Sequence, residues 1–183
     1  RTLEPTHHPV LGDGILELTD IKSAPYPGAS VVPEYCRATY DRRLLVGETK
    51  ESVLAPIQEL LDKLMTEDPQ LKAKVSYAVG KEQCYTGNEI TGERFFPGWL
   101  YDEKDEFVQD VKKELEGMGY TPEITQYNFC TNGSHYAGEA GIKTFGLGPS
   151  KENLAHTVNE YIEIDQLTKV TDCYYGVMKA LLK

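Results

Sequence analysis

The feature that constrains the fold most is a change in the order of the expected elements about halfway along the chain. In the first half, strands are expected at 14–23, 31–46 and 73–86, with a helix at 49–68. The strands are indicated by alternating apolar and polar residues between glycine and proline turns. Two strands, a helix and a further strand favour one helix packed on an antiparallel sheet. The first half is therefore expected to form an α+β two-layer domain.

The helix expected at 49–68 has an apolar stripe along one face. The stripe consists of Val53, Ile57, Leu60, Leu61 and Leu64. Thr49 or Ser52 could cap the first turn, because a hydroxyl oxygen there can accept a backbone N–H bond. Pro56 favours a start near Ser52 or later, because proline fits the first turn of a helix better than its interior.

The second half begins after a glycine-rich, aromatic stretch at 87–105, which is expected to be a loop that crosses between two domains. Beyond it, the pattern predicts helices at 105–120 and 165–183 and strands at 122–130 and 142–148. Helices and strands in alternation imply an α/β unit, with a parallel-rich sheet, flanking helices and loops at the strand ends. Asp165 is the expected cap of the last helix.

The composition excludes several classes of protein. The chain has 183 residues, 40% of them hydrophobic and 26% charged, which is typical of a globular protein large enough to bury a core. Its formal net charge of -10 argues against a nucleic-acid partner, because binding to phosphates is carried by Lys and Arg. No apolar run approaches the roughly 18 residues of a membrane span, and no signal-peptide pattern opens the chain. A membrane partner is therefore not expected.

Cysteine usage indicates the compartment. Cys36, Cys84, Cys130 and Cys173 are widely spaced and form no C-x-x-C pair. They are expected to be buried free thiols in a reducing environment rather than disulfides, and the predicted location is the cytoplasm.

Two short stretches could bind an anion. In CTNGSHYAG, a strand is expected to run into Gly133 and Ser134 and then into a helix, so that backbone N–H groups there could hold an anion. The alternative, which the bare pattern favours, is an ordinary turn with a left-handed glycine and serine as the helix cap. In YDRRLLVGE, Arg42 and Arg43 are expected on opposite faces of a strand. An arginine fork suits a fixed carboxylate, but a charge that protects an edge strand is an equally good interpretation.

Histidine candidates for a metal site are few. His156 stands alone in the polar stretch GLGPSKENLAHTVNEYIEI, where a histidine is normally a solvated side chain. His135 and Glu139 have the i, i+4 spacing of two ligands on one helix face, but no H-E-x-x-H accompanies them. A complete metal site within this chain is therefore not expected.

The same stretches, in this order and spacing, resemble the family of acetylornithine deacetylase, succinyl-diaminopimelate desuccinylase, aminoacylase and their dipeptidase and carboxypeptidase relatives. In that family a strand ends in D-x-R, a glycine turn and helix come much later, and fGpg…AHtpnEy follows near the C-terminus. Here these motifs read VVPEYCRATYDRR, TNGSHYAG and FGLGPSKENLAHTVNEYI. The last is the most specific of the three.

The resemblance covers essentially the whole chain but only the C-terminal half of a family member. It implies that residues 1–92 are the later part of the lid or dimerisation domain, and that 93–183 are the C-terminal part of the metal-binding catalytic domain, both incomplete. It further implies a hydrolase that cleaves an amide bond of an N-acyl amino acid or small peptide through a zinc-activated water. A complete enzyme would hold two zinc ions, with cobalt or manganese as alternatives, and would form a homodimer through the lid domain.

The family motifs assign roles to individual residues by resemblance. His156 would be a zinc ligand, and Glu160 would accept a hydrogen bond from the other ring nitrogen. The residues that would bind substrate are Arg43, the third residue of D-x-R, with Gly133, Ser134 and Ser30. Ser30 stands where the family often has Asn, and His135 where it often has Asp.

The family's other ligands and its general base lie in the half that this sequence does not contain, so the chain would supply no catalytic group of its own. The isolated chain is therefore expected to be inactive and to bind zinc weakly. A non-catalytic dimerisation or binding module, or a degenerate relative, is the alternative. An upstream half carrying the missing ligands would favour the enzyme.

Overall fold

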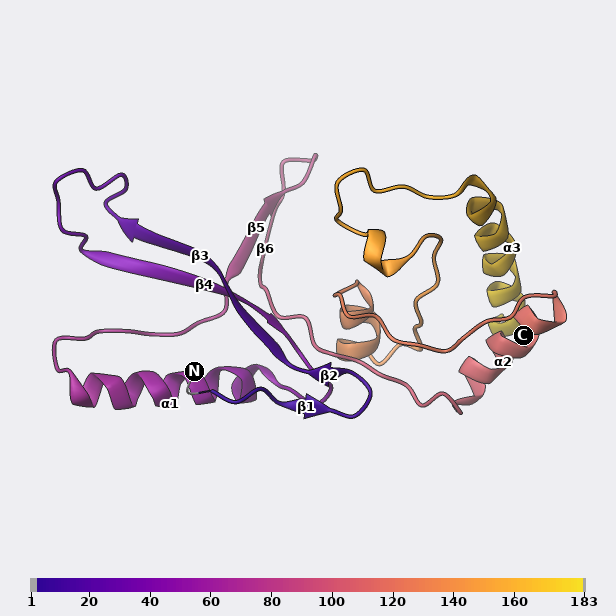
Figure 1. Ribbon diagram of the computed structural model, residues 1–183, viewed down its shortest axis with the longest axis horizontal. Helices are drawn as coiled ribbons and strands as arrows, with labels where there is room; N and C mark the ends of the chain where they lie inside the picture. The colour runs from indigo at the N-terminus through magenta and orange to yellow at the C-terminus, as the bar shows by residue number, and fades with distance from the viewer. Residues whose placement is uncertain (1–2, 183) are drawn as a thin grey trace. The chain divides into compact units, whose positions relative to one another are not determined.

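The computed structural model describes residues 3–182, and the chain divides into two compact units, one ending at Gly98 and the other beginning at Trp99 (Figure 1). Each unit is described by itself. The assignment of 1–92 to a lid domain and of 93–183 to a catalytic domain concerns the place of these residues in a complete enzyme, and it stays a prediction.

The first unit is built from three antiparallel hairpins and one long helix. Its elements are β1 (His7–His8), β2 (Gly12–Asp13), β3 (Ile15–Ala24), β4 (Tyr35–Arg43), α1 (Lys50–Glu67), β5 (Val79–Gln83) and β6 (Glu89–Glu93). β1 pairs with β2, β3 with β4, and β5 with β6, each as a separate two-stranded sheet. The expectation of one antiparallel sheet was therefore correct for the strand direction but wrong for the number of sheets.

The hairpin of β5 and β6 was missed, because 87–105 was expected to be a loop throughout. The two strands are joined by a tight turn in which the N–H of Cys84 bonds to the carbonyl of Asn88 at 2.7 Å, and that of Gly87 bonds to the carbonyl of Cys84 at 2.9 Å. Gly87 has a φ of 86°, a conformation that glycine adopts without steric cost. The turn chemistry decided the structure here more than the weak apolar pattern of β6 did.

A β-bulge explains the imperfect alternation of β3. The register moves from Leu18 opposite Tyr40 to Asp20 opposite Thr39, so Thr19 is the extra residue. Because a bulge reverses the alternation of faces, Leu18 and Ile21 lie on the same side of the hairpin although they are three residues apart.

The start of α1 differs from the expectation. The helix begins at Lys50, and Thr49 and Ser52 form a reciprocal cap: the N–H of Ser52 bonds to the Thr49 hydroxyl at 3.1 Å, and the N–H of Thr49 bonds to the Ser52 hydroxyl at 2.8 Å. Pro56 consequently lies inside the helix, where it removes one intrahelical hydrogen bond. The two capping bonds nevertheless place the start of the helix at Lys50.

The second unit is organised around two packed helices, α2 (Glu106–Gly117) and α3 (Ile164–Leu181), which lie side by side in Figure 1. Val111, Leu115 and Ala180 form the buried centre of their interface. Gly176 is needed there, because a Cβ atom at this position would stand 2.6 Å from the sulfur of Met118. The packed helices therefore form the core of the unit.

The apolar residues of α3 are covered only in part. Val170 is buried and Val177 packs against the core, whereas Leu167, Tyr174 and Leu181 are exposed. Asp165 does not cap the helix, because the capping position is Glu163, and Asp165 pairs instead with Lys169 at 2.7 Å.

The expected parallel-rich sheet was wrong for the described residues of this unit. Neither 122–130 nor 142–148 forms a strand, and every strand pair in residues 3–182 is antiparallel. A segment becomes part of a sheet only when its backbone groups pair with a neighbouring segment. Here, for example, the N–H of Asn128 bonds to the side chain of Glu152 at 2.8 Å. Beyond the two helices, the unit consists mainly of irregular segments, with a six-residue π-helical turn (Ser134–Glu139) and a short 3₁₀ turn (Glu152–Leu154).

All four cysteines are free thiols, as predicted, but none is buried: Cys36 and Cys130 are exposed, and the other two are half-buried. None of the helices formed by residues 3–182 has the length and apolar character that crossing a bilayer requires.

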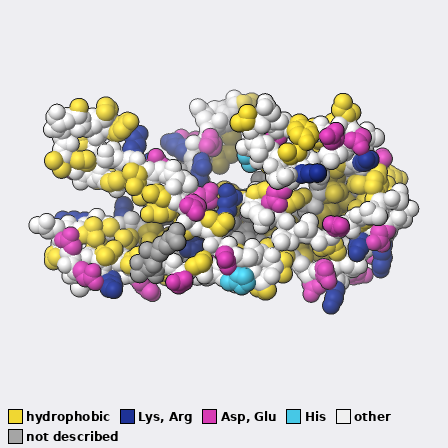
Figure 2. Space-filling model, viewed as in Figure 1, with side chains coloured by type: hydrophobic (Ala, Val, Ile, Leu, Met, Phe, Trp, Pro, Cys, Tyr) yellow, Lys and Arg dark blue, Asp and Glu magenta, His cyan; other side chains and the backbone are white. Residues whose placement is uncertain are grey.

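Apolar side chains are exposed at the outer end of the β3–β4 hairpin, seen at the upper left of Figure 2. They include Tyr26, Val31, Val32 and Tyr35. The predicted substrate residue Ser30 lies in the same connecting segment and is exposed, with a φ of 63°.

Candidate functional site

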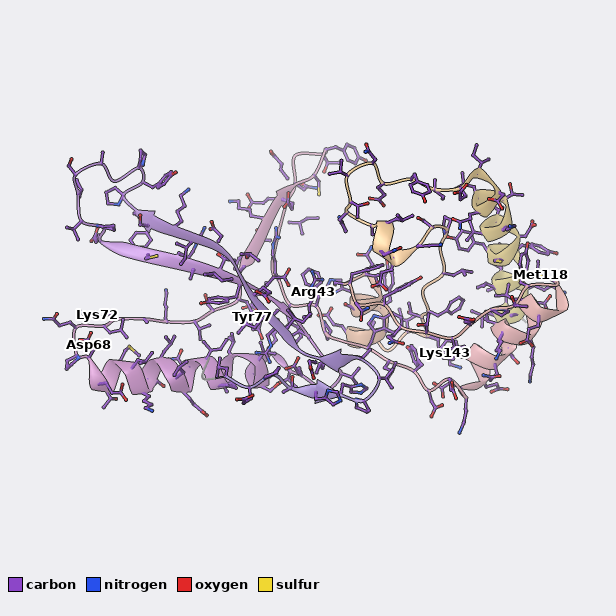
Figure 3. The ribbon with its side chains drawn as sticks, in the orientation of Figure 1. Arg43, Asp68, Lys72, Tyr77, Met118 and Lys143 are labelled. Carbon is purple, nitrogen blue, oxygen red and sulfur yellow. The ribbon has the colours of Figure 1, made fainter. Side chains whose placement is uncertain are left out.

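Arg43 lies at the end of β4, where Figure 3 labels it. Because side chains alternate along a strand, Arg43 shares a face with Asp41, and Arg42 points to the other face. The Arg43 side chain is 44% exposed, and two of its guanidinium nitrogens, Nε and Nη2, each lie 3.4 Å from one oxygen of the Asp41 carboxylate. The head group is thus held by two long contacts to one exposed carboxylate, and it remains open to solvent.

Arg42 is held within the first unit. Its guanidinium bonds to the carboxylate of Glu48 at 2.5 Å, and the two side chains are only 23% and 11% exposed. The second carboxylate oxygen of Glu48 accepts the N–H of Leu45 at 2.7 Å. The two adjacent arginines therefore differ, since one belongs to a partly buried ion pair and the other faces outward.

An aromatic contact supports the first turn of α1. The Tyr77 hydroxyl donates to the carbonyl of Lys50 at 2.8 Å, and its ring meets Phe95 edge-on, with the ring centres 5.4 Å apart. Burial raises the pKa of Tyr77. Figure 3 labels Tyr77.

The glycine turn at Thr131–Ser134 uses its own N–H groups. The N–H of Gly133 bonds to the Thr131 hydroxyl and that of Ser134 to the Thr131 carbonyl, both at 3.1 Å. Neither group is therefore directed at a bound anion, as the anion-site interpretation required. The interpretation as an ordinary turn is closer, but its reason for glycine was wrong.

Gly133 has a φ of -54°, which any residue can adopt. Glycine is needed because Trp99 packs directly on it: an added Cβ atom would lie 2.6 Å from the indole ring. Ser134 is buried, and its hydroxyl lies 3.5 Å from the sulfur of Cys130. The turn is therefore a wall against which an aromatic side chain packs.

His156 is exposed and lies in a loop in which its own φ is 61° and that of Asn159 is 62°. The Thr157 hydroxyl donates to the carbonyl of Leu154 at 2.7 Å. The Glu160 carboxylate accepts the backbone N–H of His156 at 3.0 Å. Glu160 thus contacts the main chain of His156, whereas the sequence predicted a contact with the imidazole ring.

A groove of about 540 Å³ in the second unit brings two of the sequence motifs together. One wall includes Thr131, Asn132 and Gly133 of the glycine turn, and another is formed by residues 144–152 of the FGLGPS stretch. Ala155 and Glu160, on either side of the His156 loop, also line it. The motifs that stand apart in the sequence are therefore neighbours in this unit.

Aromatic side chains that the sequence analysis did not single out line the same groove. They are Trp99, Tyr127, Phe129, Tyr136 and Phe145. The rings of Tyr127 and Phe129 are stacked, with an angle of 11° between their planes. Burial, followed by the charge of Glu152, raises the pKa of Tyr127. The i, i+2 spacing of Tyr127 and Phe129 was the signal that could have placed both rings on one side of an extended segment.

His135 and Glu139 form the pair that their spacing predicted, with 2.8 Å between Nδ1 and a carboxylate oxygen. They gain no third ligand, because no group of three or more His, Cys, Asp or Glu side chains in residues 3–182 is arranged to hold a metal ion. His156 likewise belongs to no such group among the described residues.

Comparison with known proteins decides the family. Residues 15–180 match the family described as Peptidase family M20/M25/M40. The chain belongs to this family. The match covers both units, and therefore both the strand that ends in Arg43 and the loop that carries His156.

Individual members of the peptidase family are similar over most of the chain. The uncharacterized protein YgeY of Escherichia coli (strain K12) is 33% identical over 151 residues, which are 82% of this chain and 36% of that protein. An N-formyl-4-amino-5-aminomethyl-2-methylpyrimidine deformylase of Halalkalibacterium halodurans is 33% identical over 128 residues, 68% of this chain and 28% of the deformylase. A succinyl-diaminopimelate desuccinylase of Hydrogenovibrio crunogenus is 25% identical over 154 residues, 84% of this chain and 35% of the desuccinylase.

The chain thus spans about a third of the length of the curated relatives it matches. No solved structure matches it with comparable significance.

Proposed function

We propose that this chain is part of a metal-dependent amidohydrolase that cleaves an amide bond of an N-acyl amino acid or small peptide. The observation that carries the proposal is the groove in which the glycine turn meets the FGLGPS–AHTVNEY stretch, in a chain of the peptidase family. Two relatives that are named for removing a formyl or a succinyl group support the reaction class.

Arg43 is proposed to bind the substrate carboxylate. Its exposed side chain makes two long contacts of 3.4 Å with Asp41, and a substrate carboxylate would replace them with two shorter parallel hydrogen bonds to the planar guanidinium. Arg42 is unsuited to this role, because its guanidinium is already paired with Glu48.

His156 is proposed to be one ligand of a zinc site, with cobalt or manganese as alternatives, whose other ligands come from residues outside this chain. A bound zinc ion would supply Lewis-acid polarisation of the amide carbonyl and would lower the pKa of a bound water. This chain would contribute an exposed imidazole, held in its loop by the bond from its own backbone N–H to Glu160.

Gly133 and Ser134 are proposed to act on the substrate through the shape of the groove. Their N–H groups are bonded to Thr131 and are not available to an oxyanion. The two residues would instead limit the space for the substrate on this side of the groove. Ser30 is proposed to contact substrate from the segment that joins β3 to β4.

We also propose that the protein forms a homodimer through the first unit, supported by the apolar residues exposed at the outer end of the β3–β4 hairpin. Val32, which is 89% exposed, is the residue to change. Val32→Asp should lower the dimer fraction in light scattering, because it places a charge in an apolar contact. A molar mass unchanged by the substitution would contradict this interface.

The experiment that tests the function uses the full-length protein that contains this chain. Its hydrolysis of a panel of N-acetyl amino acids and dipeptides is measured before and after treatment with a chelator, and again after zinc, cobalt or manganese is restored. We expect activity that is lost with the metal and regained on its return. The isolated 183-residue chain, assayed in parallel, should be inactive and should not retain zinc after dialysis. A full-length protein that binds these compounds but cleaves none of them would favour the non-catalytic alternative.

A further inference from the structure

Glu48 is a largely buried carboxylate to which the proposed function gives no role. Its side chain is 11% exposed, and it accepts three hydrogen bonds. The donors are the guanidinium of Arg42 at 2.5 Å, the backbone N–H of Leu45 at 2.7 Å and, more weakly, the hydroxyl of Thr6 at 3.4 Å. A carboxylate is costly to bury, and these bonds offset that cost.

The two oxygens of Glu48 hold the chain on both sides of Arg43. Oε1 binds Arg42, the residue before Arg43, and Oε2 binds the backbone of Leu45, two residues after it. Glu48 can reach back because the chain turns between Leu45 and Glu48: Gly47 has a φ of 88°, and the N–H of Glu48 bonds to the carbonyl of Leu45 at 3.3 Å.

Two further contacts fix the same stretch. Leu45 is buried, and Gly98 approaches its backbone so closely that an added Cβ atom would lie 2.7 Å from the Leu45 carbonyl carbon. The Arg43 side chain, by contrast, is held by the two long contacts to Asp41 described above. The direction in which Arg43 points therefore depends on the backbone on its two sides as well as on Asp41.

We infer that Glu48 is a positioning residue for Arg43: by binding both Arg42 and the backbone of Leu45, it holds the end of β4 so that Arg43 is presented to the carboxylate of the substrate. The inference rests on the proposed function, because it needs Arg43 to bind that carboxylate. A role for Glu48 in stability alone would leave the preference for a carboxylate unchanged, and this difference can be measured.

The experiment uses the full-length protein and pairs of substrates that differ only at the carboxylate. Each N-acetyl amino acid that the protein cleaves is compared with its C-terminal carboxamide, and the ratio of the two kcat/KM values is the readout. Glu48→Gln keeps the size of the side chain and removes its charge. We expect the ratio to fall by about 3- to 30-fold in Glu48→Gln, because a displaced fork loses one of its two bonds. In Arg43→Ala the ratio should fall further, and Glu48→Gln should have no additional effect in that background.

Two controls separate positioning from folding. Glu93→Gln removes a carboxylate of an exposed pair with Lys50 in the same unit and should leave the ratio unchanged. Glu48→Asp, which keeps the charge and shortens the reach, serves if Glu48→Gln does not fold, and it should also lower the ratio. Hydrogen exchange at the Leu45 amide should speed up in both Glu48 variants, since its acceptor is weakened or displaced.

The possible results distinguish the positioning role of Glu48 from the carboxylate-binding role of Arg43. A ratio that is unchanged in folded Glu48→Gln or Glu48→Asp, while Arg43→Ala lowers it, overturns the positioning role and leaves Arg43 as the anchor. A ratio that is unchanged in Arg43→Ala overturns the anchor and the inference together. A full-length protein that cleaves neither the N-acetyl amino acids nor the dipeptides overturns the proposed function, and the inference with it.

Discussion

Arg43 ends a nine-residue strand, whereas His156 lies in a loop between a short 3₁₀ turn and the last helix. The end of β4 is held by residues from distant parts of the sequence, since Glu48 binds Thr6 as well as Arg42, and Gly98 packs on Leu45. Next to His156, the backbone is held by bonds between residues three or four positions apart, and farther along the same loop the carbonyl of Tyr161 accepts the Ser150 hydroxyl at 3.2 Å.

The difference teaches that the two candidate residues depend on different kinds of support. Changing the loop near His156 should have local effects, because its bonds are local. Changing the support of Arg43 should affect the folding of the first unit, because buried groups are left without partners.

The largest effect is expected for His156→Ala in the full-length protein. Loss of a zinc ligand should remove one of two bound zinc ions and lower kcat by roughly a thousandfold or more, while the melting temperature changes little. Metal analysis and turnover are measured together. His135→Ala is the matched control and should retain both metals. If His156→Ala kept both metals and near-normal turnover, His156 would be an ordinary loop residue.

Arg43→Ala should lower kcat/KM by about one to three decades, as expected for the loss of a charge-assisted fork, with little change in stability. Arg43→Lys should restore only part of the activity, because an ammonium group lacks the planar fork.

Arg42→Ala should lower stability more than Arg43→Ala does, and kcat/KM less. It leaves Glu48 without its cation and should lower the free energy of unfolding by about 1–3 kcal/mol. Urea denaturation and steady-state kinetics on the same samples distinguish a loss of stability from a loss of activity. A catalytic loss in Arg42→Ala together with normal kinetics in Arg43→Ala would show that Arg42, and not Arg43, binds the substrate carboxylate.

Gly133→Ala tests the wall of the groove. The backbone conformation suits alanine, but the methyl group would overlap Trp99, so we expect a loss of about 1–3 kcal/mol from overpacking. Trp99 is the single tryptophan of the chain, and its fluorescence should therefore report the displacement directly. Unchanged stability and an unchanged emission maximum would show that the contact is not needed.

The smallest effect is expected for Thr49→Ala at the start of α1. Removal of the capping hydroxyl should cost about 0.5–2 kcal/mol in the free energy of unfolding. Thr66→Ala, in the last turn of the same helix, lacks this role and should cost less. If the two substitutions were equally mild, the helix would start later, as Pro56 suggested from the sequence.

Features that depend on neighbouring residues could be predicted from the sequence. The expected helices at 49–68, 105–120 and 165–183 correspond to α1, α2 and α3, because apolar periodicity and glycine stops act within a few turns. The i, i+4 pair of His135 and Glu139 followed from spacing alone. The family motifs identified the peptidase family, and the match over residues 15–180 confirmed it.

Features that depend on contacts between distant segments were decided only by the tertiary structure. The strands expected at 122–130 and 142–148 are not formed in the described chain, because a strand requires a partner that local sequence does not specify. Gly133 is needed because of Trp99, which lies 34 positions earlier in the sequence, and not because of its own φ. The sequence by itself determined where the helices lie and which family motifs the chain carries. The partner of Glu48, the aromatic lining of the groove and the different surroundings of Arg42 and Arg43 were decided by packing, because burial and pairing are set by residues that meet only in the folded chain.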